Sequence, residues 1–274
     1  MDMTPYLPIE GEKPLDRIVD DGGFTAIFRT IACVGDSLSS GEFESQNADG
    51  VKGFHDRFEY SWGQYIARAA GCKVYNFSQG GMTAVNYMTD FAVKKCFFTP
   101  DLAAQAYILA MGVNDVRAVE NGKYEDGWGS VEDIADDYRD NKKSFFGYFA
   151  AIIQRYQEIQ PDAKFFLMTR PRIKDGDPVA QQHADTMYAI AGRLSNCYVL
   201  DFNQYGPVYD AAFKDRFYLG GHMNPTGYIL TAKMTMSYID YIIRHNFEDF
   251  VQVGFIGTGL ANVNAYPIKE KEKK

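Results

Sequence analysis

The residues of this chain that are able to do chemistry together are a serine, a histidine and an asparagine. Ser37 follows a short apolar run, and His222 stands in a glycine-rich loop near the last helix. A hydroxyl with an imidazole base is the pair required to form and break an acyl-serine bond. Asn114 and the backbone N–H groups around Gly80 and Gly81 offer donors for the oxyanion of such a reaction. The residue types therefore predict acyl transfer at a serine.

Ser37 lies just past a segment, residues 31–34, that reads as a buried parallel strand. This segment is short and has a β-branched residue at each end. Open α/β sheets bind their ligands at the carboxyl ends of the strands, which makes Ser37 a candidate nucleophile. The sequence Gly35-Asp36-Ser37 is also common turn chemistry, in which Asp36 would brace the turn by backbone hydrogen bonds. The choice between these readings depends on the residues at the other strand ends.

Four more strands are expected, each too far from the last to form a hairpin. Gly80 and Gly81 follow the second strand, Asn114 follows the third, and the His222 loop follows the fifth. Parallel strands bring these residues to one edge of a sheet. Strands that alternate with helices predict a doubly wound α/β sheet with helices on both faces. The four expected strands are residues 73–77, 106–111, 164–169 and 197–201.

The helices are recognised by their ends. Ser61 has the spacing of a capping box, and Gly71 follows the expected helix as its C-cap. Asn224 and Pro225 have the residue types of an N-cap and first residue for the last helix. Apolar residues at three- and four-residue spacing predict the longest helix, over about residues 131–160.

One domain is expected over residues 1–274. Its core would span about residues 31–245, with extensions at residues 1–30 and 250–274 that do not follow the alternation. Apolar residues make up 46% and charged residues 23% of the 274, which is an ordinary globular balance.

The net charge of −8 argues against nucleic acid or an anionic membrane as a partner. No segment has the ~20 apolar residues of a membrane span. The first 21 residues are acidic with three prolines, unlike a secretory signal, so we expect a cytoplasmic protein unless a signal has been removed. The oligomeric state is left open by the sequence.

Neither the cysteines nor the remaining histidines indicate a metal site. His55, His183 and His245 lack paired ligand spacing, so we expect no metal and no other cofactor. The cysteines show no CxxC spacing, and we expect them to be small buried hydrophobic residues rather than ligands or disulfides: Cys33, Cys72, Cys96 and Cys197.

Four segments together resemble the GDSL or SGNH hydrolases. They are Gly35-Asp36-Ser37-Leu38, the segment from Asn76 through Gly81, Gly112-Val113-Asn114-Asp115, and the His222 loop. The resemblance implies a three-layer α/β/α sandwich, the flavodoxin-like fold of this family, with a central, mostly parallel five-stranded sheet. It also implies Ser37 as nucleophile and His222 as general base and then acid. No metal or organic cofactor takes part in that chemistry.

The same resemblance implies an oxyanion hole made by the N–H of Ser37, the N–H of Gly81 and the side chain of Asn114. Gly81 is preferred because it stands five residues after Asn76, and Gly80 is the fallback.

The chain departs from the family at the residue that orients the histidine. The family usually has an aspartate three residues before the histidine, and this chain has Leu219. Three explanations stay open. A main-chain carbonyl in residues 217–220 accepts the Nδ1 proton and leaves a Ser-His dyad, which we favour; Asp215 or Asp201 takes the role; or the site is impaired.

The substrate is less well defined by the sequence. Arg170 and Arg172 follow the fourth strand and would suit an anionic or polyhydroxyl substrate, although a solvated loop explains them equally well. Residues 41–60 and 122–129, which contain aromatic side chains, are candidate walls of a pocket.

From these residues and the resemblance we expect a serine esterase that hydrolyses small acyl esters. We favour acetyl esters, with a carbohydrate as the preferred alcohol. The alternatives are an acyltransferase that uses the same site and a non-catalytic binding module that retains the fold.

Overall fold

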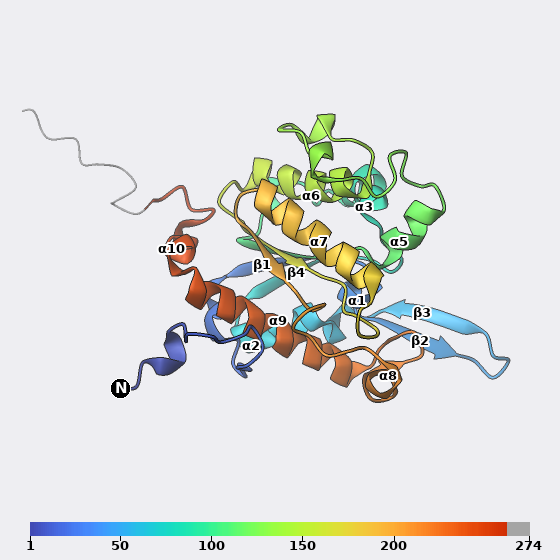
Figure 1. Ribbon diagram of the computed structural model, residues 1–274, viewed down its shortest axis with the longest axis horizontal. Helices are drawn as coiled ribbons and strands as arrows, with labels where there is room; N and C mark the ends of the chain where they lie inside the picture. The colour runs from blue at the N-terminus through green and yellow to red at the C-terminus, as the bar shows by residue number, and fades with distance from the viewer. Residues whose placement is uncertain (262–274) are drawn as a thin grey trace, which may run out of the picture.

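A five-stranded parallel sheet forms the centre of the computed structural model, which describes residues 1–261 (Figure 1). Its strand order is β4-β1-β5-β6-β7, and every neighbouring pair is parallel. The five predicted strands are confirmed, and none of their ends differs by more than one residue. The strands are β1 (Thr30–Gly35), β4 (Lys73–Ser78), β5 (Ala106–Ala110), β6 (Lys164–Met168) and β7 (Cys197–Leu200).

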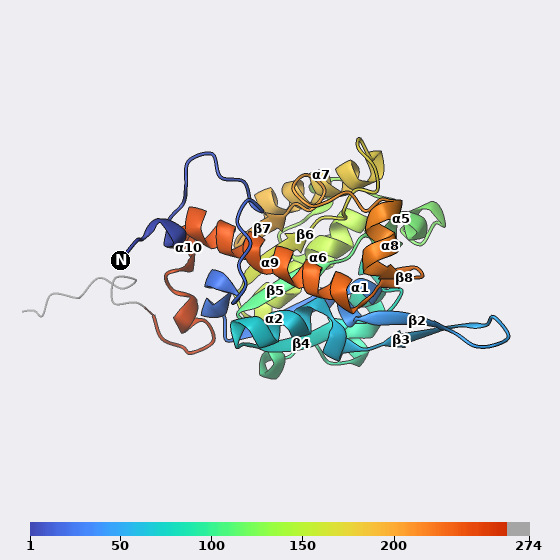
Figure 2. The same ribbon diagram turned by 90° about the horizontal axis from the view of Figure 1, so that it is seen from below.

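Helices cover both faces of this sheet and complete the predicted three-layer sandwich (Figures 1 and 2). One face packs against α2 (Trp62–Ala70) and α9 (Pro225–His245). The other packs against α3 (Ala84–Asn86), α6 (Phe145–Ile159) and α7 (Pro178–Arg193). The shorter helices are α1 (Ser37–Ser40), α4 (Ala92–Lys94), α5 (Val113–Glu120), α8 (Ala211–Phe217) and α10 (Phe247–Phe250).

The two predicted helix starts are confirmed by their hydrogen bonds. The Ser61 side chain accepts from Gln64 N at the start of α2, and Gly71 ends that helix with φ +66°. The Asn224 side chain accepts from Gly227 N at the start of α9, with Pro225 as its first residue. Both caps satisfy N–H groups that have no partner within the helix.

The long helix predicted over residues 131–160 is wrong in its first half. Helix α6 begins only after Ser144, whose side chain accepts from Gly147 N. The preceding residues form two short 3-10 turns, Val131–Asp133 and Tyr138–Asp140. Side chains there bind backbone groups in place of a helical ladder; the Asn141 side chain, for example, accepts from Ala135 N.

Residues 41–60 contain a hairpin that the sequence analysis missed. Strands β2 (Glu42–Gln46) and β3 (Lys52–Asp56) are antiparallel and project from the body beside the carboxyl ends of the sheet (Figures 1 and 2). The Asn47 side chain accepts from Asp49 N and Val51 N and so shapes the turn. Glu42 is paired with Asp56, and Glu44 with Phe54, so these four side chains share one face of the hairpin.

A second, smaller hairpin carries the predicted histidine. It consists of β8 (Tyr218–Leu219) and β9 (His222–Met223), joined by Gly220 and Gly221. Its β9 strand contacts both α1 and β2, which brings the His222 loop beside the Ser37 turn.

The two expected extensions both contact α9. In the N-terminal one, Glu12 binds the buried Arg244 through two hydrogen bonds of 2.6 and 3.0 Å. In the C-terminal one, Phe250, Val253 and Ile256 are buried in the cluster on the α9 side of the sheet. The rest of that extension, residues 262–274, lies outside the described residues.

Two expectations about buried residues are corrected. The four cysteines are free, but only Cys33 is fully buried and Cys96 is exposed. Residues 122–129 are absent from the lining of the small pocket beside Asp36 and Leu38: Tyr124 is in the core, and Trp128, which packs on Phe145, lines a separate cavity against α7.

Candidate active site

Ser37 is the first residue of α1, separated by one residue from the end of β1, which lies between β4 and β5 in the sheet. Asp36 precedes it in extended conformation and accepts from Leu38 N at 3.0 Å, which fixes the turn. The N–H of the first residue of a helix has no intrahelical partner and points along the positive end of the helix. Ser37 therefore presents a hydroxyl and a backbone donor at the same place.

Asn114 lies next to this turn, at the start of α5. Its Nδ2 donates to Asp36 Oδ2 at 3.3 Å and to Met82 O at 3.1 Å. Asp36 therefore binds two groups: its Oδ1 caps α1, and its Oδ2 accepts from the Asn114 amide. Burial, together with the charges of Asp115 and Glu42, raises the pKa of Asp36 to about 7. The structure thus brings Asn114 and the Ser37 turn together.

The Gly80-Gly81 turn completes this edge of the sheet. Gln79 N donates to Gly35 O, which ties the turn to the strand before Ser37. Gly81 has φ +72° and is exposed, and a side chain at that φ would be strained. Gly80 N, the alternative to Gly81 N as an oxyanion donor, instead donates to Asp56 Oδ2 of the β2–β3 hairpin at 3.4 Å.

His222 is oriented by a residue that the sequence analysis missed. Its Nδ1 donates to Glu44 Oε1 at 3.0 Å, and Gly221 N donates to the same oxygen at 2.6 Å. The Phe54 ring meets the imidazole edge to face, with ring centroids 6.0 Å apart. Strand β2 and the β8–β9 turn therefore hold the imidazole between them.

The two glycines before His222 allow this close approach. A Cβ at Gly220, where φ is +71°, would lie 2.6 Å from Glu44 Oε2, and one at Gly221 would lie 2.4 Å from Oε1. Burial acts to raise the pKa of Glu44, but hydrogen bonds from His222, Lys52 and Gly221 N outweigh it and lower that pKa. Glu44 is therefore a charged acceptor at Nδ1, the position where the serine-protease triad has its aspartate.

This contact corrects the expectations for the orienting group. Nδ1 is engaged by Glu44 and not by a carbonyl of residues 217–220. Asp201 is 2% exposed and its carboxylate accepts from Tyr188 and from Gln204 N, whereas Asp215 is exposed on α8. Leu219, which replaces the usual aspartate, is 55% exposed. The only signal in the sequence was the alternation of Glu42 and Glu44 before the turn residues 47–50, which indicates a strand but not its contact with His222.

A second carboxylate faces the other ring nitrogen. Glu42 Oε1 lies 3.0 Å from His222 Nε2. Burial, then repulsion by Asp56 and Glu44, raises the pKa of Glu42, although His222 and His55 act in the opposite direction. Both ring nitrogens face carboxylate oxygens, and an ionised carboxylate can only accept a hydrogen bond. Each nitrogen therefore has a hydrogen bond only when both donate, or when His222 and Glu42 share a proton.

Arg170 and Arg172, the two candidate substrate-binding arginines, differ in their surroundings. Arg172 donates to the carbonyls of Asn203 and Gln204, so it fixes the loop after β7. Arg170 lines a small apolar pocket that also contacts Asp36 and Leu38. Of the two, only Arg170 lies beside the Ser37 turn.

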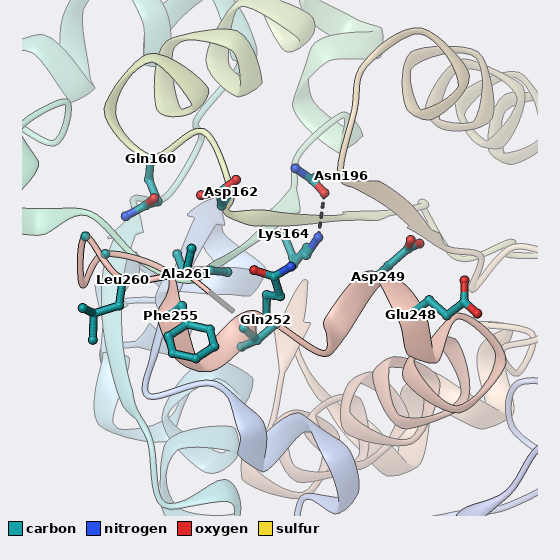
Figure 3. Close-up of a pocket in the computed structure, with 14 residues that line it drawn as sticks. Gln160, Asp162, Lys164, Asn196, Glu248, Asp249, Gln252, Phe255, Leu260 and Ala261 are labelled. Atoms are coloured by element: carbon teal, nitrogen blue, oxygen red, sulfur yellow. Dashed lines mark hydrogen bonds between the residues drawn. The ribbon is translucent and has the colours of Figure 1, made fainter. Parts of the chain in front are cut away.

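A larger cavity, of about 520 Å³, lies at the opposite edge of the sheet (Figure 3). Lys164, at the start of β6, lines it and donates to Asn196 Oδ1 at 2.6 Å. Burial lowers the pKa of Lys164, against the charges of Asp249 and Asp162. The described lining of this cavity contains no serine, cysteine or histidine.

Residues 33–230 match the GDSL-like Lipase/Acylhydrolase family. Within residues 1–261, no helix is both long enough and apolar enough to cross a membrane. A comparison with curated proteins finds no match for this chain.

Solved structures share the fold. A family two carbohydrate esterase from Clostridium thermocellum, solved with cellohexaose, has a TM-score of 0.52 and 12% identity over 81% of this chain and 65% of that one. The α/β hydrolase LAE5 from the metagenome of Lake Arreo has a TM-score of 0.51 and 16% identity over 78% and 96%. A carbohydrate esterase family 2 enzyme with a carbohydrate binding domain, from Corynascus thermopiles (Myceliophthora fergusii), has a TM-score of 0.50 and 16% identity over 77% and 65%.

These identities support the fold, while the family match covers the strand ends that carry Ser37, Gly81, Asn114 and His222. The predicted resemblance is thereby confirmed: this chain belongs to the GDSL-like lipase/acylhydrolase family of ester hydrolases.

Proposed function

We propose that this protein hydrolyses small acyl esters, acetyl esters above all, through an acyl-enzyme formed on Ser37. The observation that carries the proposal is the charged Glu44 acceptor on Nδ1 of His222, 3.0 Å away. A carboxylate at Nδ1 holds the imidazole in the tautomer that accepts a proton at Nε2, and it stabilises the imidazolium that follows. With Glu44 in this role, the missing aspartate at Leu219 does not imply an impaired site.

In the first half-reaction the Ser37 hydroxyl gives its proton to His222 Nε2 while its Oγ attacks the ester carbonyl carbon. The N–H groups of Ser37 and Gly81 stabilise the resulting oxyanion. The Asn114 amide joins them by exchanging its 3.3 Å contact with Asp36 Oδ2 for the oxyanion. His222 then returns the proton to the departing alcohol oxygen, and the acyl group stays on Ser37.

In the second half-reaction water attacks the acyl-enzyme. His222 Nε2 takes a proton from that water, the bond between the acyl carbon and Ser37 Oγ breaks, and the proton returns to Oγ. For both half-reactions Nε2 must be released from Glu42.

The small pocket beside Ser37 supports a short acyl group. Its volume is about 40 Å³, and its walls are mainly apolar. A single water requires roughly 10–15 Å³ of cavity volume, so this pocket has room for an acetyl or slightly longer acyl chain. The pocket is lined by residues that include Leu38, Trp62, Met111, Met168 and Met223.

A polyhydroxyl alcohol is the preferred second half of the ester. Two of the structural neighbours are carbohydrate esterases, and the groove beside Glu42 is lined by polar side chains such as Asn76 and Gln79. Amide and carboxylate oxygens accept hydrogen bonds from sugar hydroxyls.

Initial rates on p-nitrophenyl acetate test the proposed reaction. The native protein is expected to exceed the background rate, and Ser37→Ala and His222→Ala are expected to reduce the rate to background. An equal rate for the native protein and Ser37→Ala would contradict the role of Ser37.

A further inference from the structure

Glu42 occupies a position that the hydrolytic mechanism leaves unexplained. One oxygen of its carboxylate, Oε1, lies 3.0 Å from His222 Nε2. The other, Oε2, lies against the Gly80-Gly81 turn, because a Cβ built on Gly80 would clash with it. The carboxylate therefore spans the space between the general base and the turn that carries the Gly81 N–H.

That space is where the alcohol half of an ester must bind. His222 Nε2 gives its proton to the leaving oxygen, so this oxygen and its neighbouring atoms approach Nε2 from the side of Glu42. A substrate enters only if it draws the Glu42 carboxylate away from Nε2. Hydroxyl groups next to the ester oxygen do so by offering the carboxylate new donors.

The surroundings of Glu42 favour neutral donors over anions. A groove of about 540 Å³ begins at Glu42 and includes Asp56, whose carboxylate accepts from the Ser40 hydroxyl. Asn76 and Gln79 line the same groove, and Lys95 is the one cation in its described lining. An anionic alcohol would meet two carboxylates there, and at a few ångströms such repulsion is substantial even when partly screened.

The backbone of Glu42 is fixed, so its side chain alone can respond. The Tyr228 hydroxyl donates to Glu42 O at 2.8 Å, and β2 pairs with β3 at this residue. An amide at this position would keep the size of the side chain and remove its charge. The backbone contacts therefore allow the charge to be tested without a change in the fold.

We propose that Glu42 is a specificity-determining residue, which accepts hydrogen bonds from the hydroxyl groups of a polyhydroxyl alcohol and excludes esters of anionic alcohols. This inference rests on the proposed hydrolysis at Ser37 and names the class of alcohol that the site selects.

The test compares acetate release from two matched esters, the monoacetates of glycerol and of glycerate, which differ in a hydroxymethyl or a carboxylate group. For the native protein we expect kcat/KM to be about tenfold or more higher on the glycerol ester. Glu42→Gln is expected to lower that ratio by about tenfold. Glu248→Gln removes the same charge at the far edge of the sheet and should leave the ratio unchanged.

Gly80→Ala provides a second variant, because its methyl group requires the Glu42 carboxylate to move. It should raise KM for the glycerol ester more than it changes kcat. A Glu42→Gln protein with Ser37-dependent activity and an unchanged ratio would overturn the inference alone. A native protein without Ser37-dependent release from either ester would overturn the proposed hydrolysis, and this inference with it.

Discussion

The Glu44 carboxylate lies 3.0 Å from His222 Nδ1 although the two residues are 178 positions apart in the chain. Glu44 belongs to a hairpin inserted after the nucleophile turn, whereas the family's usual aspartate stands three residues before the histidine. The acceptor for Nδ1 therefore comes from a segment near the other end of the chain. Gly220 and Gly221 leave the space into which the glutamate fits.

The first prediction concerns Glu44 as the residue that positions His222. Glu44→Gln should lower kcat on p-nitrophenyl acetate by about 10²- to 10⁴-fold, because the amide neither fixes the tautomer nor stabilises the imidazolium. KM should change far less than kcat. Glu248→Gln is the matched control, and an unaltered kcat in Glu44→Gln would contradict the assignment.

The second prediction is that a carboxylate at position 219 restores part of the activity that Glu44→Gln loses. Leu219 is paired with His222 across the β8–β9 ladder, so the two side chains share a face. Leu219→Asp in the Glu44→Gln background should recover about tenfold or more of the lost kcat, since it returns a carboxylate to the neighbourhood of Nδ1. The control is Leu219→Asn in the same background. Equal rates for the double variants that carry Leu219→Asp and Leu219→Asn would contradict the prediction, because they would show that a carboxylate at this position does not interact with the imidazole.

The third prediction concerns the oxyanion donor Asn114. Asn114→Ala should reduce kcat by about 10²- to 10³-fold with a small effect on KM, because the donor acts on charge that develops in the transition state. Circular dichroism of the variant checks that α5 is intact. A loss confined to KM would instead place Asn114 in ground-state binding.

The fourth prediction concerns His183, which is buried and lies outside the catalytic group. Its Nδ1 accepts from Arg170 N at 3.1 Å and its Nε2 donates to Met111 O at 2.9 Å, so both partners are satisfied by the neutral ring. Burial lowers the pKa of His183 from 6.5 to about 4. Its ring resonances should therefore titrate near pH 4, and a midpoint near 6.5 would contradict the buried neutral state.

The same shift has a consequence for stability. As the pH falls, His183 takes up a proton in the unfolded chain before it does so in the folded protein. The contribution of neutral, buried His183 to the free energy of unfolding is therefore complete above about pH 6.5 and is lost as the pH falls toward 4. It amounts to roughly 3 kcal/mol. His183→Gln, which can keep both hydrogen bonds, should lose correspondingly less free energy of unfolding than the native protein between pH 7 and pH 4. Equal losses in urea titrations would contradict this.

Much of the fold follows from local sequence patterns. Short apolar segments predict the five strands, and the caps at Ser61 and Asn224 predict the starts of α2 and α9. The first half of the helix predicted over residues 131–160 is wrong because its charged and amide side chains bind nearby backbone groups. Periodicity alone does not register that competition.

The site residues that could be predicted are those at the ends of the sheet strands, together with His222, which the resemblance to the family implied. Ser37, Gly81 and Asn114 follow strands β1, β4 and β5, and the structure places them at one edge of the sheet. Glu44 follows no such rule, because it depends on how the hairpin packs against the β8–β9 turn. A contact between segments that distant in the chain has no local pattern by which to find it.

Covalent labelling by a fluorophosphonate, followed by intact mass, tests the central claim most directly. The reagent reacts with a serine hydroxyl that a base has activated. We expect one adduct per native chain, none on Ser37→Ala, and labelling slowed by about 10²-fold or more in Glu44→Gln. An adduct on Ser37→Ala, or a native protein that stays unlabelled, would contradict the claim that Ser37 is activated by His222 and Glu44.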